Sequence, residues 1–199
     1  MKRIAMFAVS SVIAGLLASS PAHADATGNV NFFVGQKSLS SSDWEPVEKQ
    51  GEFGAVMSFG QKTWPVSIAV DVLVSTDDQD AFDPFIGNYT LTGTTYEVDF
   101  GVRKVWGKAR TRPYIGAGLA LLGASAEIES GGASIDGDDS AVGFWADAGI
   151  FWRLGSHFNL GLDVRYSDAD VDLDFGSGLV ATDVGAGGFS YGLLLGFGW

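Results

Sequence analysis

The stretch GGFSYGLLLGFGW, residues 187–199, decides the fold. Its large apolar side chains occupy every second position: Phe189, Tyr191, Leu193, Leu195, Phe197 and Trp199. The positions between them are small, apart from Leu194: Ser190, Gly192, Gly196 and Gly198. A period of two indicates a β-strand with two different faces. Burying the large face gains roughly 1.5–3 kcal/mol per side chain, so something apolar must cover it. The small face suits the crowded interior of a narrow barrel. We therefore predict a transmembrane strand of a closed β-barrel, with its large side chains toward lipid.

The first 24 residues have the three parts of a secretory signal peptide. Lys2-Arg3 gives the positive start, residues 4–18 form the apolar segment, and Ala22-His23-Ala24 is a small-x-small cleavage site. About 15 apolar residues are too few for a transmembrane helix. We predict cleavage between Ala24 and Asp25, which leaves residues 25–199 as a single domain.

The composition narrows the class of protein. The chain has 28 Gly, 13% aromatic residues and only 18% charged residues, and its net charge is −12. The negative charge argues against a nucleic-acid partner. The absence of Cys from the sequence excludes disulfides and thiol chemistry. An exported, glycine-rich and aromatic-rich chain without a helical period is typical of a membrane barrel.

Eight segments of the chain alternate between two faces. They are residues 30–37, 53–59, 66–75, 94–106, 113–124, 141–152, 158–167 and 187–199. The connections alternate between long, acidic stretches (38–50, 76–91, 125–140 and 168–186) and short turns (60–65, 107–112 and 153–157). Outer-membrane barrels have this asymmetry, with long outer loops and short periplasmic turns. The sequence therefore predicts an all-β fold, a transmembrane eight-stranded antiparallel up-and-down β-barrel with four long acidic outer loops.

The tryptophans support this topology independently. Trp64, Trp106 and Trp152 lie at the three short turns, and Trp199 ends the last strand at the same level. Amphipathic rings are most stable at a membrane boundary, so we predict a periplasmic aromatic girdle. Four aromatic residues fall toward the opposite boundary: Tyr96, Tyr166, Phe189 and Tyr191.

Four stretches resemble the OmpA/OmpX-type outer-membrane β-barrel superfamily: NFFVGQKS (31–38), PYIGAGLALL (113–122), WRLGSHFNLGLDVRYS (152–167) and YGLLLGFGW (191–199). The resemblance covers essentially all of the mature chain. It implies a Gram-negative outer membrane, with the lipid bilayer and lipopolysaccharide as surroundings. The terminal aromatic on an alternating strand is similar to the signal that the barrel assembly machinery reads. OmpA itself carries a peptidoglycan-binding domain after the barrel; since this chain ends at Trp199, we expect none here.

Charged residues on the inward faces are the most informative polar set: Asp71, Glu97, Asp99, Arg103, Asp147, Asp163 and Arg165. Side chains fill the interior of an eight-stranded barrel. Charges there must be paired, since breaking a buried pair costs about 3–5 kcal/mol. We predict a salt-bridge network that plugs the lumen, with a gate or narrow conductance path as the alternative.

Other chemistry has little support. His157 is the one histidine after the leader, and its place in a short turn indicates a solvated side chain, so we expect no enzyme and no cofactor. The acidic stretches DGDDS (136–140) and DADVDLD (168–174) are either solvated surface or divalent-cation bridges to lipopolysaccharide phosphates. We expect a structural or surface-interaction role. The rivals are a secreted, lipocalin-like barrel that binds a small hydrophobic ligand, a lipid-modifying barrel enzyme and a narrow channel.

Overall fold

The computed structural model describes residues 25–40, 42–84, 87–107, 110–131, 133–175 and 180–199. The expected leader, including Ala24 of the cleavage site, lies outside these residues, and Asp25 is exposed. Eight strands form the barrel: β1 (Ala26–Leu39), β2 (Lys49–Gln61), β3 (Ser67–Asp83), β4 (Gly87–Val105), β5 (Thr111–Ser130), β6 (Ala133–Leu154), β7 (Phe158–Asp168) and β10 (Gly188–Gly198). Three smaller elements complete the described chain: the 3-10 turn η1 (Ser42–Trp44) and the hairpin strands β8 (Asp170–Asp174) and β9 (Val180–Gly185).

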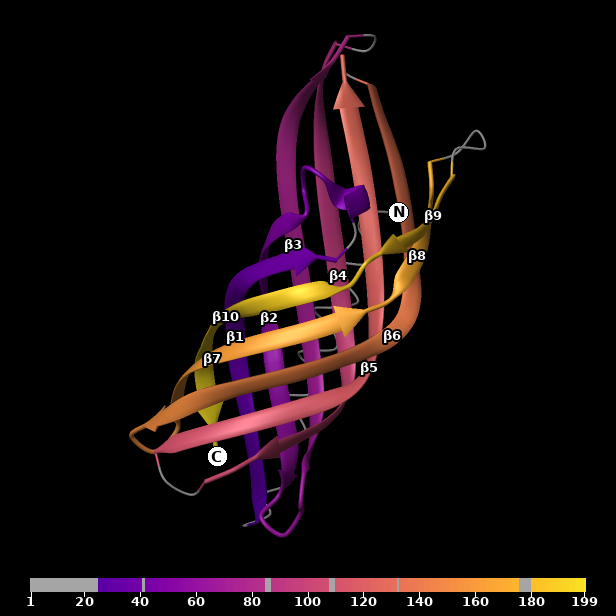
Figure 1. The fold of residues 1–199 in the computed structure, drawn as a ribbon. Helices are drawn as coiled ribbons and strands as arrows, with labels where there is room; N and C mark the ends of the chain where they lie inside the picture. Colours follow the sequence, from indigo (N-terminus) through magenta and orange to yellow (C-terminus); the bar gives the residue numbers. More distant parts are fainter. Residues whose placement is uncertain (1–24, 41, 85–86, 108–109, 132, 176–179) are drawn as a thin grey trace.

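The barrel closes in the order β1-β10-β7-β6-β5-β4-β3-β2, and every neighbouring pair is antiparallel (Figure 1). The first and last barrel strands pair from Asn29 opposite Gly198 to Leu39 opposite Gly188. The predicted eight-stranded antiparallel up-and-down barrel is therefore confirmed. In the described part of the chain, no helix has the length and apolar character needed to cross a membrane.

The two faces of the wall follow the alternation. On β10, Leu195 is 43% exposed and Phe197 is 62% exposed on the outside, whereas Leu194 is buried in the lumen. The inward face of β1 departs from a purely polar pattern, because Phe33 is also buried inside. The outside of the wall is thus apolar, whereas the inside combines buried charged and polar side chains with apolar ones such as Phe33 and Leu194. An apolar outer face and charges inside are typical of a membrane barrel.

The glycines of the small face make room for close contacts inside. Gly35 and Gly192 face each other across the β1–β10 seam, and the ring of Phe33 lies over both. A Cβ atom built on Gly192 would meet the Val34 carbonyl oxygen at 2.5 Å and the Phe33 ring at 2.7 Å. A larger residue at position 192 would therefore displace either the seam or the ring that fills the lumen beside it.

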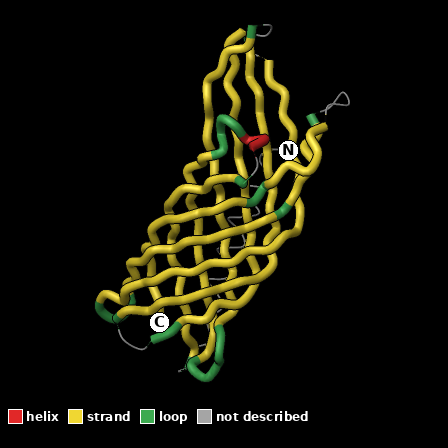
Figure 2. Tube along the Cα trace, viewed as in Figure 1, coloured by secondary structure: helices red, strands yellow, loops and turns green. Residues whose placement is uncertain are grey.

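Two of the four predicted long loops are strands in the structure, so this part of the prediction is wrong. Strands β3 and β4 stay in register up to Asp83 opposite Gly87, and β5 and β6 up to Ser130 opposite Ala133. Residues 76–91 and 125–140 are therefore mostly tall β-hairpins, which rise above the rest of the barrel (Figure 2). Beyond the membrane both faces of a strand meet water, so the apolar alternation that marks the strand disappears from the sequence.

The other two outer connections fold back over the barrel mouth. The first runs through η1 and buries Trp44 and Val47, although the stretch looks polar in the sequence. The last carries the β8–β9 hairpin, which packs beside β6. The backbone N–H of Asp172 donates to Oδ2 of Asp139 on β6 at 2.9 Å. Tall hairpins stand on one side of the outer end, and inward-folded segments cover it.

Candidate functional site: the lumen and the outer end

All seven charged residues predicted for the lumen are buried there. Their exposed fractions are at most 5%, and they come from β3, β4, β6 and β7 at alternate positions. The structure brings them together in one connected group around two arginines. We call this group, with Lys37, the charge belt.

Arg103 on β4 joins neighbouring strands. Its Nη2 lies 2.7 Å from Oδ2 of Asp71 on β3, and its Nε donates to Oδ2 of Asp147 on β6 at 3.1 Å. Its Nη1 also donates to the Met57 carbonyl oxygen on β2 at 3.1 Å. One guanidinium therefore ties four strands together, with the fixed fork geometry that suits carboxylates.

Arg165 on β7 crosses the lumen. Its Nη2 lies 2.5 Å from Oδ2 of Asp71, and its Nη1 donates to Asp99 on β4. Four strand steps separate β7 from β3 in either direction around the ring, so the Arg165–Asp71 bridge joins opposite walls. Asp163 lies 3.9 Å from Nε and Glu97 lies 4.0 Å from Nη1.

Several lumen partners were not in the predicted charge set. Lys37 on β1 is 1% exposed, and its Nζ lies 3.0 Å from Oε2 of Glu97, which also accepts from Ser167 at 2.8 Å. Tyr114 donates its hydroxyl to Asp163. The ring of Trp145 packs against both arginines, with Arg103 and Arg165 at 5.5 Å and 5.3 Å from its centroid. Their inward positions in the alternation were the signal that could have found them.

Acids outnumber bases in this part of the lumen. Buried Glu52 adds a sixth carboxylate to five already in the charge belt, against Lys37 and two arginines. Five of these carboxylates keep one oxygen without a hydrogen-bond partner: Glu52, Glu97, Asp99, Asp147 and Asp163. The lumen therefore disfavours anions.

An apolar cap lies toward the outer end. Trp44 and Val47 from the first connection pack with Leu122 on β5 and with Val171 and Val184 of the β8–β9 hairpin. The indole Nε1 of Trp44 donates to the Gly185 carbonyl oxygen at 2.8 Å, which links the first and last outer connections. Because these side chains are apolar and buried, the mouth above the charge belt is an unfavourable place for water.

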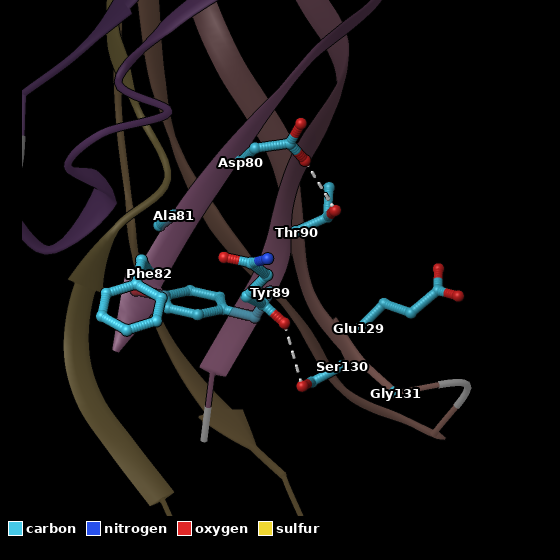
Figure 3. A pocket seen from close by; sticks show the side chains of 9 residues that line it. Asp80, Ala81, Phe82, Tyr89, Thr90, Glu129, Ser130 and Gly131 are labelled. Carbon is cyan, nitrogen blue, oxygen red and sulfur yellow. Dashed lines mark hydrogen bonds between the residues drawn. The ribbon is translucent and has the colours of Figure 1, made fainter. Parts of the chain in front are cut away.

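A cleft of about 610 Å³ opens between the tips of the tall hairpins (Figure 3). Asp80 and Phe82 line it from β3, Tyr89 and Thr90 from β4, and Glu129 from β5. Thr90 donates to Oδ1 of Asp80 at 2.8 Å, and Phe82 is 71% exposed. The cleft thus offers aromatic surface and carboxylates to the exterior.

The predicted girdle residues all lie at the end of the barrel where the short turns are. Trp64, Trp106 and Trp199 are 44%, 43% and 48% exposed, and Trp152 is partly exposed. Trp199 contacts Phe59, with the ring centroids 6.3 Å apart. His157 is exposed in the third of these turns, as the sequence indicates.

The acidic stretches form exposed strand surface. On β8, Asp170, Asp172 and Asp174 share the exposed face. Within the described residues, no group of three or more acidic or histidine side chains is placed to hold a metal ion. The backbone N–H groups of Asp172 and Ser140 lower the pKa of the Asp139 carboxyl from its ordinary value. Asp139 is therefore a charged anchor for the β8–β9 hairpin.

The chain belongs to a family of membrane barrels: residues 4–197 match the outer membrane protein beta-barrel domain family. It is an integral protein of the bacterial outer membrane, and its wall contacts the lipid bilayer. A comparison with curated protein sequences gave no match.

Three solved structures share the fold at low sequence identity. The attachment invasion locus protein Ail of Yersinia pestis, in complex with the heparin analogue sucrose octasulfate, has a TM-score of 0.59 at 12% identity, covering 88% of this chain and 99% of that one. OprG from Pseudomonas aeruginosa gives 0.56 at 14%, covering 88% and 95%. A major outer membrane protein from Thermus thermophilus gives 0.55 at 14%, covering 88% and 100%. These likenesses show the fold alone.

Proposed function

We propose that this protein is a passive outer-membrane barrel that keeps its lumen closed and uses its outer hairpins for contacts with the surroundings. The observation that carries the first part is the Arg165–Asp71 bridge between opposite walls. Lipocalin-like binding of a hydrophobic ligand has no support, because ion pairs fill the lumen around this bridge and the apolar side chains inside are packed against one another.

Two layers of side chains fill the lumen. The charge belt occupies the middle of the barrel with ion pairs that reach across it. The apolar cap covers the outer mouth with two connections joined through Trp44. An ion entering the lumen would have to cross the apolar cap and then displace paired, buried charges, each costing several kcal/mol.

Conductance across a planar lipid bilayer tests the closed lumen. We expect the wild-type protein to give no discrete current steps. Removing the bridging side chain with Arg165→Ser should widen the gap in the charge belt and produce flickering, cation-preferring current, because the carboxylates stay. Resolved steps from folded wild-type protein would establish the rival narrow channel instead.

Contact with the surroundings is supported by the outer cleft and by the acids around it. Ail was solved in complex with the heparin analogue sucrose octasulfate. Here the cleft carries Asp80 and Glu129, and the charge of the whole chain is −12, so a polyanion would be repelled. The surface that we propose therefore favours neutral or cationic partners.

Binding measurements on protein in nanodiscs test the sign of this preference. We expect poly-lysine to bind in a salt-sensitive manner and sucrose octasulfate not to bind. The variant Asp80→Asn with Glu129→Gln should weaken poly-lysine binding more than the matched pair Asp170→Asn with Asp174→Asn, which lies away from the cleft. If both pairs weaken poly-lysine binding equally, binding depends on the negative charge of the whole surface and not on the cleft.

The proposal extends to how the protein is processed and assembled and to the lipids around it. We propose cleavage between Ala24 and Asp25, a single barrel domain over residues 25–199, and recognition of the C-terminal strand by the barrel assembly machinery. Contact with lipopolysaccharide is supported by the exposed acids, although a bridging cation would need ligands from the lipid as well as the protein. The mass of the purified protein tests the cleavage position.

A catalytic role is not part of the proposal. The one histidine of the described chain, His157, is exposed in a turn, far from the carboxylates of the charge belt. A lipid-modifying enzyme would need a nucleophile and a base that converge. Deleting the gene should leave the mass spectrum of lipid A unchanged; a new or missing acyl species would support the enzyme.

A further inference from the structure

The end of the barrel opposite the acidic hairpins carries a basic pocket of about 540 Å³. Four cationic residues line it: Lys62, Lys104, Arg112 and Arg153. The lining contains no Asp or Glu side chain, although acids outnumber bases two to one in the whole sequence. The chain therefore collects positive charge at one place, against its overall sign.

Arg153 on β6 is the buried member of this group. It is 9% exposed, and its guanidinium donates to two neutral acceptors, Oδ1 of Asn159 and Oδ1 of Asn29, both at 2.8 Å. Among the described residues, no carboxylate lies within ion-pairing distance of it. Arg103 and Arg165, by contrast, each contact at least two carboxylates.

Arg112 lines the same pocket as Arg153, so two guanidinium groups share it. Burying a charge without a counter-charge is costly. The Asn29 oxygen receives the Nδ2 of Asn159 at 3.1 Å as well as Arg153, so these amides hold the guanidinium in place. The arrangement leaves a fixed cation beside an open cavity, which an anion would neutralise.

The other residues that line the pocket indicate which class of anion would bind there. An arginine fork matches the tetrahedral oxygens of phosphate. Lys62 and Lys104 add point charges at the rim, where Lys62 Nζ also lies 3.9 Å from Oδ1 of Asp25 and Lys104 donates to the Pro65 carbonyl oxygen. Trp64 and Trp199 border the pocket and are about half exposed. Indole rings of this kind lie at the level of lipid head groups, and basic pockets at that level bind anionic head groups.

We propose that this basic pocket is a binding site for a phosphate-bearing anion, either the head group of an anionic phospholipid or a soluble phosphate. Its place on the periplasmic side rests on the proposed orientation of the barrel. The chemistry does not, because the pocket belongs to the turn end of the barrel in either orientation.

Native mass spectrometry of the folded protein in detergent, with phosphatidylglycerol as the probe, tests the lipid source. We expect the wild type to retain phosphatidylglycerol and Arg153→Gln to lose about tenfold in apparent affinity, the scale of one hydrogen bond to a charged group. Arg110→Gln is the matched control, because Arg110 is exposed near the same turn and does not line the pocket.

A competition arm with inorganic phosphate separates the two sources. Displacement of the lipid only at high phosphate concentration assigns the site to head groups; saturable phosphate binding without lipid retention assigns it to a soluble ligand. If Arg153→Gln fails to fold, Arg112→Gln takes its place. The proposal is overturned if neither probe binds the wild type more tightly than it binds the pocket variants. That result would leave the conductance test of the closed lumen unaffected.

Discussion

The charge belt and the apolar cap close the same lumen by opposite means. The charge belt consists of strand residues held in a continuous register, such as Asp71, Arg103 and Arg165. The apolar cap is made mostly by connections that fold inward, around Trp44 and Val184. The side chains inside the barrel therefore need not be apolar at the level of the membrane. The strands shield the interior from lipid, so charges are tolerated there once they are paired.

The largest loss of unfolding free energy is expected when Arg165, the side chain that crosses the lumen, is removed from the charge belt. Arg165→Met leaves Asp71 and Asp99 without their cross-lumen partner, and an uncompensated buried charge costs about 3–5 kcal/mol of unfolding free energy. Urea unfolding in lipid vesicles, followed by the change in gel mobility, measures it. Arg110→Met, which changes an exposed arginine, should stay close to wild type; equal losses would deny the charge belt a structural role.

A smaller loss is expected on the lipid side of the wall. Leu195→Arg should cost about 2–4 kcal/mol near the midplane, where no partner can neutralise the cation. Ile135→Arg on the tall part of β6 is the control, since Ile135 is also exposed but lies above the membrane in our orientation. The same unfolding assay compares them. Our assignment of the faces would not survive a Leu195→Arg protein as stable as wild type.

Removing one hydrogen bond from the apolar cap should destabilise only the segments that this bond joins. Trp44→Phe keeps most of the apolar ring and deletes the bond to the Gly185 carbonyl oxygen, worth about 1 kcal/mol. Hydrogen exchange should therefore speed up about fivefold at Val184 and Ala186, with the β3–β4 amides unchanged. A uniform change over the whole barrel would mean that the cap and the charge belt unfold together.

The smallest effect is expected from a change of pH, which alters how firmly Asp139 holds the β8–β9 hairpin at the edge of the apolar cap. Because the pKa of Asp139 is lowered in the folded protein, its bond to the Asp172 N–H stabilises the hairpin fully above 3.8, the ordinary value. That stabilisation is lost as the pH falls through the lowered pKa. The Asp172 amide shift should follow this titration in an NMR series, and Asp139→Asn should abolish it. A midpoint at the ordinary value would contradict the anchor.

Much of the wall could be predicted from the sequence, because lipid on one side and a packed lumen on the other impose strict alternation. Leu195 and Asp71 each lie on the face that the pattern indicates. The tall hairpins were missed since strands in water lose that pattern, as around Thr90. The apolar cap was missed because Trp44 sits in a polar stretch whose inward turn depends on long-range contacts.

The alternation in the sequence also does not specify which charged side chains form ion pairs inside the lumen. The pattern places Arg165 inside, but its contact with Asp71 depends on how β7 and β3 face each other once the ring has closed. The surroundings of Arg153 have the same origin. The sequence places Arg153 in a short turn, which gives no sign that the structure holds it on β6 between two asparagines.

The seam between β1 and β10 has a consequence for how the protein is made. Val34 finds its partner Leu193 only after all the strands between them have been synthesised and exported. Contacts of such long sequence separation form late and slowly. Until then β1 keeps an unsatisfied edge in the periplasm, so the chain depends on protection from aggregation before it reaches the membrane.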